Sequence, residues 1–347
     1  MAKLNTGDVP EDISVEDIMA SLSKETRADV VFGSEIVKRV LPTASFGLNQ
    51  KIGGGLRLGM QHTFWGGEGA GKSGFLMETV GINQKNGVPC AWIDAEGVFD
   101  PEWASKLGVD PEKLIVSRAA TIPEATDKQI EWIRKGVRLI VLDTTSALMS
   151  KSFVDKNGEI KGFDDTAQLG QMAKDLGQMS KMVMGINYTC AVVHISQQRV
   201  NVGSPAMHKP YMQTGGKEIG HNDALRVRLI GTGTDDKLLK TKVQRGNNLV
   251  EEVVGFPVDY IMNKNRITGD ITPGTYDFMR ANNTYKPGVN YVGEVLDWAV
   301  NFGFAEKGGA WYTIGEHRAQ GRAAAVKLLL ENPELAKSLE DQIVQSI

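Results

Sequence analysis

A glycine-rich segment, Gly66-Gly67-Glu68-Gly69-Ala70-Gly71-Lys72-Ser73, constrains the fold of this chain more than any other feature. It follows the apolar run His62–Trp65 and precedes an amphipathic segment, as a loop between a buried strand and a helix does. The spacing of Gly, four residues and then Gly-Lys-Ser is that of a P-loop, whose backbone N–H groups surround nucleotide phosphates. We therefore expect a strand–loop–helix unit that binds ATP and Mg²⁺. A glycine-rich turn that precedes a lysine by chance is the alternative.

The residue types of this segment divide the work of holding a nucleotide. Lys72 would reach the β- and γ-phosphates, and the hydroxyl of Ser73 would coordinate Mg²⁺. The helix N-terminus behind the loop adds a favourable field for the phosphates. We assign nucleotide contacts to Gly66, Gly67, Glu68, Gly69, Ala70, Gly71, Lys72, Ser73 and Gly74.

Apolar runs alternate with helical segments from about residue 45 to 270, which predicts an α/β core with a mainly parallel sheet flanked by helices. The runs are His62–Trp65, Cys90–Ile93, Leu139–Leu142, Ala191–Ile195, Leu225–Ile230 and Leu238–Val243. Helices are expected over 72–85, 123–135 and 166–186, since apolar residues there keep a helical period.

The two ends of the chain have a different texture. Residues 1–42 are mixed in charge with a helical pattern, and we interpret them as an N-terminal arm that serves oligomerisation. From about 275 we expect a helix near 291–302, a short strand pair around Ala310–Ile314, and helices over 321–331 and 334–346. These predict a core over 43–272 and a small α+β C-terminal domain over 273–347.

Composition excludes some classes of protein. The 347 residues carry 39 Lys and Arg against 42 Asp and Glu, a net charge of −3, so a nucleic acid partner would depend on local charge. No apolar run reaches the roughly 18 residues of a membrane span. The start of the chain has acids and Pro where a signal peptide would be basic and then apolar, so we expect a cytoplasmic protein. Cys90 and Cys190 lie in apolar runs, which favours buried free thiols over a disulfide.

Carboxylates follow two of the apolar runs. In open α/β sheets the ligand binds beyond the carboxyl ends of the strands. Asp143 ends one run and would hold Mg²⁺, although strands also end in Asp as a turn residue. Asp94 and Glu96 end another, and either could activate water for attack on the γ-phosphate, while either could instead cap a turn.

A third run is followed by Ser196-Gln197-Gln198. An amide at this place can report whether the γ-phosphate is present, because it hydrogen-bonds the phosphate without adding charge. The residues from Gln198 to Lys217 then show no period and carry Arg199, Lys209 and Lys217 without any acid. A segment this long is usually functional or disordered, and its side chains suit a nucleic acid backbone. A solvated surface loop is the alternative.

A second basic cluster lies at Lys237, Lys240, Lys242 and Arg245. The spacing places Lys240 and Lys242 on one face of a strand. A solvated strand face is the simpler interpretation.

Taken in order, these motifs resemble the RecA recombinase family of bacteria and phages, from about residue 43 to the C-terminus. The stretch from Ala91 to Pro101 is similar to the family's Ile-Asp-Ala-Glu motif, with Asp-Pro four residues later. Gly309-Ala-Trp-Tyr312 and the segment from Gln320 to Glu334 are similar to its small C-terminal domain. A P-loop alone is shared by many proteins, whereas this ordered set is specific.

The resemblance implies a RecA-like P-loop ATPase core and roles for its residues. Glu96 is implied as the catalytic carboxylate, with Asp94 structural. Gln197 is implied as the γ-phosphate sensor at the root of the second DNA-binding loop, about 198–216. Asp100 and Trp103 fall where the family holds the adenine.

The resemblance also implies how DNA and a neighbouring subunit are contacted. Arg199 falls where the family has a phosphate contact, and Val202 where an aliphatic side chain enters between base triplets. The DNA-binding set is Arg199, Val202, Lys209, Gly215 and Gly216, with a first DNA loop over 152–166. Lys242 and Arg245 fall in the strand that reaches ATP across the subunit interface, and we count both as catalytic. The family's second basic residue there is Asn247 in this chain, which departs from the pattern.

We therefore predict an ATP-dependent recombinase that forms helical filaments on single-stranded DNA, pairs it with double-stranded DNA and hydrolyses ATP. A replicative helicase of the same core fold should lack the domain of Gly309–Tyr312. A signalling ATPase of this fold would lack the basic second loop. A filament regulator that binds ATP without turnover would lose Glu96 or Lys72, and the chain has both.

Overall fold

The computed structural model describes residues 39–153, 171–200, 211–213, 218–231, 237–245, 248–280 and 286–347. The chain divides into two compact units, Met1–Arg39 and Val40–Ile347. Residues 1–38 lie outside the described residues, so the N-terminal arm stays a prediction. All elements named below belong to the second unit.

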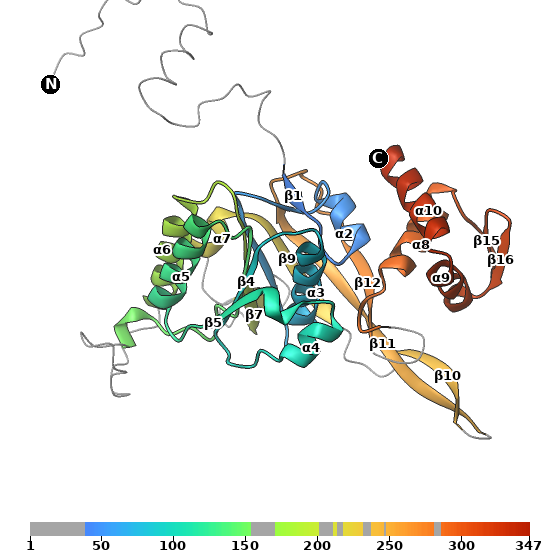
Figure 1. Cartoon of the computed structure of the whole chain (residues 1–347), viewed down its shortest axis with the longest axis horizontal. Coiled ribbons are helices and arrows are strands. Elements are labelled where there is room, and N and C mark those ends of the chain that lie inside the picture. Colours follow the sequence, from blue (N-terminus) through green and yellow to red (C-terminus); the bar gives the residue numbers. More distant parts are fainter. Residues whose placement is uncertain are drawn as a thin grey trace, which may run out of the picture. The chain divides into compact units, whose positions relative to one another are not determined.

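Figure 1 shows the elements along the chain and labels many of them. The helices are α2 (Phe46–Lys51), α3 (Lys72–Lys85), α4 (Pro101–Lys106), α5 (Ile122–Lys135), α6 (Gln171–Met184), α7 (Glu218–Asn222), α8 (Tyr291–Phe302), α9 (Arg322–Glu331) and α10 (Pro333–Ser346). The strands are β1 (Val40–Leu41), β2 (Leu56–Arg57), β3 (Gln61–Gly66), β4 (Cys90–Asp94), β5 (Leu114–Arg118), β6 (Leu139–Asp143), β7 (Ala191–Val200), β8 (Tyr211–Gln213), β9 (Asp223–Gly231), β10 (Leu239–Arg245), β11 (Asn248–Asn265), β12 (Gly274–Met279), β13 (Gly288–Val289), β14 (Glu306–Gly308), β15 (Trp311–Ile314) and β16 (His317–Gln320).

One large sheet organises the second unit, in the order β13-β12-β11-β9-β3-β7-β6-β4-β5. Each neighbouring pair from β9 to β5 is parallel. The pairs from β9 to β13 are antiparallel. Each apolar run in the sequence coincides with or overlaps a strand of this sheet, which confirms the predicted α/β class.

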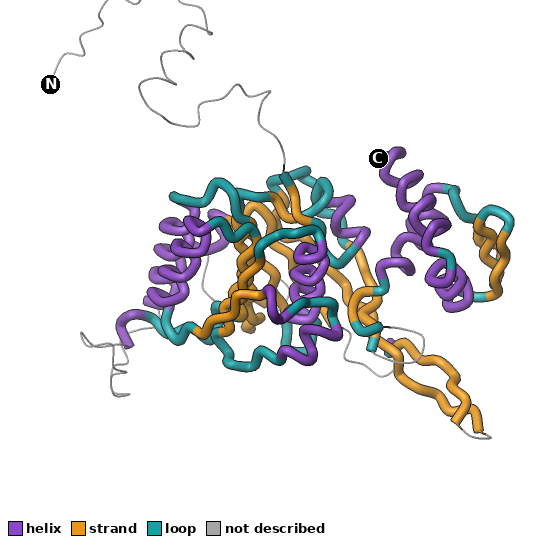
Figure 2. Tube along the Cα trace, viewed as in Figure 1, coloured by secondary structure: helices purple, strands orange, loops and turns teal. Residues whose placement is uncertain are grey.

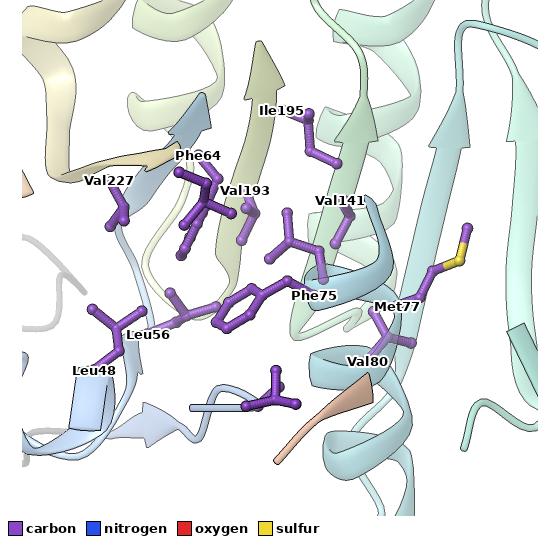
Figure 3. Packing of buried hydrophobic residues seen from close by; sticks show 14 of the residues in the cluster. Leu48, Leu56, Phe64, Phe75, Met77, Val80, Val141, Val193, Ile195 and Val227 are labelled. Carbon is purple, nitrogen blue, oxygen red and sulfur yellow. The ribbon is translucent and has the colours of Figure 1, made fainter. Parts of the chain in front are cut away.

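Helices cover both faces of the parallel strands (Figure 1, Figure 2). Alternate residues of β4 enter different cores: Trp92 packs in the cluster of α3, and Ile93 packs in that of α5 and α6. Phe75 of α3 lies among strand residues such as Phe64 and Val193 (Figure 3). This burial on both faces explains why the strands read as continuous apolar runs.

The helix boundaries follow from local signals. Helix α5 begins with a capping box, in which Thr121 and Glu124 each bond the other's backbone N–H. It ends at Gly136, whose φ of 97° lies in the left-handed region that favours glycine. The predicted helices 72–85 and 291–302 coincide with α3 and α8.

A third core cluster joins α8, α9 and α10 to the small sheet β14-β15-β16. The sequence predicted a strand pair here, and the third strand was missed because β14 is exposed along its whole length and has no apolar pattern. Strands β12 and β13 follow the predicted boundary at 273 and pair within the large sheet.

Two further findings bear on the sequence predictions. Cys90 and Cys190 are buried free thiols. Among the described residues, we find no helix with the length and apolar character that a membrane crossing requires.

Candidate active site

The glycine-rich loop joins β3 to α3, as the sequence predicts. A Cβ atom on Gly66 would lie 2.2 Å from the backbone oxygen of Leu229, so the strand end has no room for a side chain. Gly69 and Gly71 have φ angles of 70° and 78°, which L-residues rarely adopt. Cβ atoms on Gly67 and Gly69 would meet nothing within 4 Å. The loop is thus a backbone cradle open on one side, and it fits a phosphate chain.

Lys72, the first residue of α3, lies inside this loop. Its side-chain Nζ donates to the backbone oxygen of Gly67 at 2.7 Å, and the residue is 8% exposed. Burial lowers its pKa, while the negative charges of Asp143, Glu96 and Glu68 act in the opposite direction. A cation bonded to the loop backbone and surrounded by negative charge is placed to neutralise phosphate oxygens.

Asp143 ends β6 beside the loop and is buried. Burial raises its pKa to about 6, and a hydrogen bond from Ser73 opposes that rise. Within the described part of the chain, its Oδ1 has no hydrogen-bond partner. A buried, unpartnered carboxylate oxygen next to a serine hydroxyl fits a hard cation such as Mg²⁺.

The described residues hold no group of three or more His, Cys, Asp or Glu side chains that could bind a metal alone. A Mg²⁺ ion held by Asp143 and Ser73 would therefore take its other ligands from phosphate oxygens and water. That is the usual arrangement where the metal arrives with a nucleotide.

Asp94 and Glu96 differ in their surroundings. The buried carboxylate of Asp94 accepts bonds from the backbone nitrogens of Gly97 at 2.8 Å, Val98 at 3.2 Å and Phe99 at 3.0 Å. Asp94 therefore fixes the turn after β4. Glu96 is exposed, and its Oε1 accepts a bond from Thr144 Oγ1 at 3.0 Å. Asp94 thus has a structural part in the turn, and the reactive role of Glu96 stays a prediction.

Gln197 lies at the end of the parallel part of β7 and reaches Glu96. Its Nε2 donates to Glu96 Oε1 at 3.2 Å, and its backbone nitrogen donates to Ser146 Oγ at 3.0 Å. Strand β6 lies between β7 and β4, so the two side chains meet beyond its end, where Thr144 also bonds Glu96. The structure thus brings together Lys72, Ser73, Glu96, Asp143 and Gln197.

Asp100 and Trp103 form the start of α4. Asp100 caps this helix, since its Oδ1 accepts from the nitrogens of Glu102 and Trp103 at 2.9 and 3.2 Å. Trp103 is partly buried against the main core cluster. Their contact with an adenine stays a prediction.

The predicted DNA-binding residues are placed only in part. Arg199 is exposed on β7, whose end pairs with β8 as a hairpin. Val202, Lys209, Gly215 and Gly216 lie outside the described residues, as does most of the first loop, 152–166. The backbones of Lys242 and Arg245 pair with Glu251 and Asn248 in the β10–β11 hairpin.

Three residues that lie near the site, Phe278, Arg226 and Arg228, were not identified from the sequence. A Cβ atom on Gly74 would lie 2.9 Å from Phe278 Cζ, so β12 covers the start of α3. Arg226 and Arg228 bond the base of the β7–β8 hairpin. Two arginines inside the otherwise apolar strand Leu225–Ile230 were the signal that could have identified them.

Comparisons with known proteins agree with this geometry. Residues 14–258 match the RecA N-terminal domain, and residues 293–347 match the RecA C-terminal domain. The chain is 32% identical over 308 residues to Protein RecA of Pseudomonas savastanoi, covering 87% of this chain and 80% of that protein. It is 32% identical over 306 residues to Protein RecA of Cereibacter sphaeroides, covering 87% and 82%. The values for Pseudomonas fluorescens are 31% over 312 residues, 88% and 82%.

The two domain matches together span most of the chain, and the relatives are matched over most of their own length. Helicase, signalling and regulator alternatives are not favoured by these matches. The chain therefore belongs to the RecA family of recombinases, which are DNA-dependent P-loop ATPases.

Proposed function

We propose that this chain binds ATP and Mg²⁺ at the loop of Gly66–Ser73, assembles as a helical filament on single-stranded DNA, and exchanges that strand with a homologous duplex. ATP between neighbouring subunits would favour the DNA-binding arrangement, and hydrolysis would release it. This is a population shift driven by a ligand that binds one state better.

The contact between Gln197 and Glu96 is the observation that carries the proposal. It joins Glu96, next to the phosphate loop, to β7, which continues into the basic segment from Gln198 to Lys217. A γ-phosphate near Lys72 would compete with the carboxylate of Glu96 for the amide of Gln197, because a terminal phosphate carries more negative charge and more acceptor oxygens than one carboxylate. The amide would then leave Glu96, and β7 would respond to the nucleotide.

The other side chains supply the chemistry of hydrolysis. Lys72 would donate to phosphate oxygens, and Asp143 with Ser73 would hold Mg²⁺, which neutralises charge on the phosphates. Glu96, released from Gln197, would accept a proton from the attacking water. Arg245 and Lys242 on β10 would add cations to the site of a neighbouring subunit.

Electron microscopy with a slowly hydrolysed ATP analogue and single-stranded DNA tests this proposal. We expect continuous helical filaments for the parent protein. The Lys72→Ala variant is the control, because it lacks the cation that holds the phosphates. Closed hexameric rings on DNA would support a helicase instead and contradict the proposal.

A further inference from the structure

Two arginines of β9 bind the base of the hairpin that leads into the basic segment. Gln198 of β7 and Gln213 of β8 are cross-strand partners there. Arg228 donates from Nε and Nη2 to Gln198 Oε1, at 3.2 and 2.9 Å. Arg226 donates from Nη2 to Gln213 Oε1. Each strand of the hairpin is thus held by one arginine, and we call these four residues the arginine–glutamine clamp.

Aromatic rings connect this clamp to the nucleotide loop. The guanidinium carbon of Arg228 lies 5.2 Å from the ring centroid of Trp65 and 4.9 Å from that of Tyr211. Trp65 directly precedes Gly66 and is the register partner of Arg228 in the parallel β3–β9 pair. Tyr211 begins the returning strand β8. Arg228 therefore contacts both the strand of the phosphate loop and the strand that leaves the basic segment.

Arg226 is fixed by a buried polar network on its other side. Its Nε lies 3.4 Å from Oδ2 of Asp223, which is fully buried. Asp223 Oδ1 accepts from Gln61 Nε2 at 2.7 Å, and Gln61 Oε1 accepts from Ser180 Oγ at 2.9 Å. These hydrogen bonds hold Asp223 in place. Arg226 joins them by an ion pair, since neither its Nε nor Asp223 Oδ2 has a hydrogen-bond partner among the described residues. This ion pair links the clamp to β3 and α6.

The position of Gln198 gives the clamp a role in the reaction. Gln198 directly follows Gln197, whose amide contacts Glu96. Successive residues of a strand point to opposite faces. The side chain of Gln197 bonds Glu96 on the nucleotide side, and the side chain of Gln198 is bonded by Arg228 on the other face. A shift of Gln197 along β7 would reach its neighbour Gln198, and through it the hairpin base that Arg226 and Arg228 bond.

We propose that Arg226 and Arg228 are positioning residues, which keep Gln198 and Gln213 paired at the base of the hairpin so that a change at Gln197 reaches both of its strands. The proposal rests on the proposed function, since it takes Gln197 as the nucleotide sensor. A direct contact of Arg228 with a DNA phosphate is the competing interpretation.

The two interpretations predict different effects of nucleotide and of salt on the DNA affinity of an Arg228 variant. The dissociation constant for a fluorescent oligothymidine is measured with and without the ATP analogue, over a range of salt, for the parent and Arg228→Lys. Lysine keeps the charge but has no planar fork to donate twice and stack on rings. We expect the nucleotide-dependent gain in affinity to fall at least about fivefold, the lower end of typical coupling. Affinity without nucleotide and its salt slope should stay as in the parent.

Arg138→Ala is the matched control. Arg138 donates to Thr189 Oγ1 at 3.0 Å near the start of β6, at the opposite end of the parallel strands. The Arg138→Ala variant loses an arginine and one side-chain hydrogen bond, and its nucleotide-dependent gain in DNA affinity should stay unchanged. Gln198→Ala removes only the acceptor and keeps the experiment decisive if Arg228 variants do not fold. Its loss should match that of Arg228→Lys, and the double variant should lose no more than either alone.

Three results would overturn the clamp. One is a full nucleotide-dependent gain in both Arg228→Lys and Gln198→Ala. Another is weaker binding without nucleotide together with a flatter salt slope, which marks a phosphate contact. The third is a parent protein without any nucleotide-dependent gain, which overturns the proposed function and the clamp with it. The first two results, in a parent that does gain affinity, overturn the clamp alone.

Discussion

The amide of Gln197 hydrogen-bonds the carboxylate of Glu96 over 3.2 Å, although 101 residues separate them in the chain. Glu96 follows β4, and Gln197 lies on β7, with β6 between these strands. This contact therefore connects the end of β4, beside the phosphate loop, to the part of β7 that leads into the basic segment. The predictions below test the groups on each side of it.

Glu96→Gln should keep ATP and DNA binding while slowing DNA-stimulated hydrolysis about 10²-fold or more, the usual scale for loss of a general base. The amide keeps the size of the side chain and still accepts a hydrogen bond. Steady-state ATPase assays and nucleotide binding measure the two effects. Glu102→Gln, on the exposed side of α4, is the control. Normal hydrolysis by Glu96→Gln would show that another group activates the water.

Gln197→Ala should bind ATP as the parent does but lose the enhancement that ATP gives to DNA affinity. Couplings of this kind are about 1–3 kcal/mol, or roughly 5- to 150-fold in affinity. DNA titrations with and without the ATP analogue measure it. Gln178→Ala on α6 serves as the control, because it removes an exposed amide whose bond among the described residues is to Met182 in its own helix. Equal enhancement in Gln197→Ala and the parent would rule out the sensor.

Arg199→Ala should weaken single-stranded DNA binding about equally for all sequences, because a phosphate contact carries no base information. The slope of log affinity against log salt should fall by about 0.7, the share of one phosphate on a single strand. Binding isotherms at several salt concentrations give this slope. Arg134→Ala on α5 removes an exposed arginine elsewhere and should leave it unchanged. An unchanged slope for Arg199→Ala would show that Arg199 is a solvated surface residue that makes no phosphate contact.

The buried histidines His62 and His194 should make the protein sensitive to acid. Burial lowers the pKa of His62 to about 4 and that of His194 to about 3, with the charge of His62 adding to the second shift. Their Nε2 atoms lie 3.0 Å from Arg57 O and Gln129 Oε1, and their Nδ1 atoms have no hydrogen-bond partner among the described residues. A proton added to either ring would place an unpaired N–H in the core.

The unfolded chain binds these protons near pH 6.5 and the folded chain does so only at lower pH, so the stability that these two histidines contribute falls as the pH falls below 6.5. Buried carboxyls such as Asp143, whose pKa is raised to about 6, act in the opposite direction, so the test compares variants with the parent. The loss is about 1.6 kcal/mol per histidine between pH 6.5 and pH 5. Urea unfolding at both pH values should show a smaller loss for His194→Gln than for the parent. His317→Gln, on the exposed strand β16, is the control. Equal losses in all three proteins would contradict this account.

Arg245→Ala should act across the subunit interface. A guanidinium against the γ-phosphate can be worth about 10³-fold or more in turnover. A Lys72→Ala subunit cannot hold its own ATP, and an Arg245→Ala subunit cannot complete its neighbour's site. Their mixture should therefore regain part of the DNA-dependent ATPase, because some junctions have one intact site. A mixture as inactive as each variant alone, with filaments still formed, would exclude a role in trans.

The sequence predicted the parallel core because its strands are buried on both faces and read as apolar runs. It did not predict β11, an 18-residue strand that carries Gly255 and Pro257. Pro257 usually argues against a strand. It is tolerated here because β11 leaves β10 at Gly255, and pairing with β9 begins only at Val258.

The site was predicted only in part, because sequence motifs indicate single residues and not which of them meet in space. Residue types and spacing indicate Lys72, Ser73 and Asp143, whereas the choice of Glu96 over Asp94 and the role of Gln197 follow from the resemblance to the RecA family. The bond between Gln197 and Glu96 depends on the strand order, which local patterns do not contain. The clamp depends on register as well, since Gln198 and Gln213 become neighbours only when β7 and β8 pair.

Strand exchange between a single-stranded DNA and a labelled homologous duplex tests the central claim most directly. We predict transfer of the labelled strand that requires ATP and fails with a heterologous duplex or with Lys72→Ala. If the parent hydrolyses ATP in response to DNA but transfers no strand from a homologous duplex, the chain is not an active recombinase.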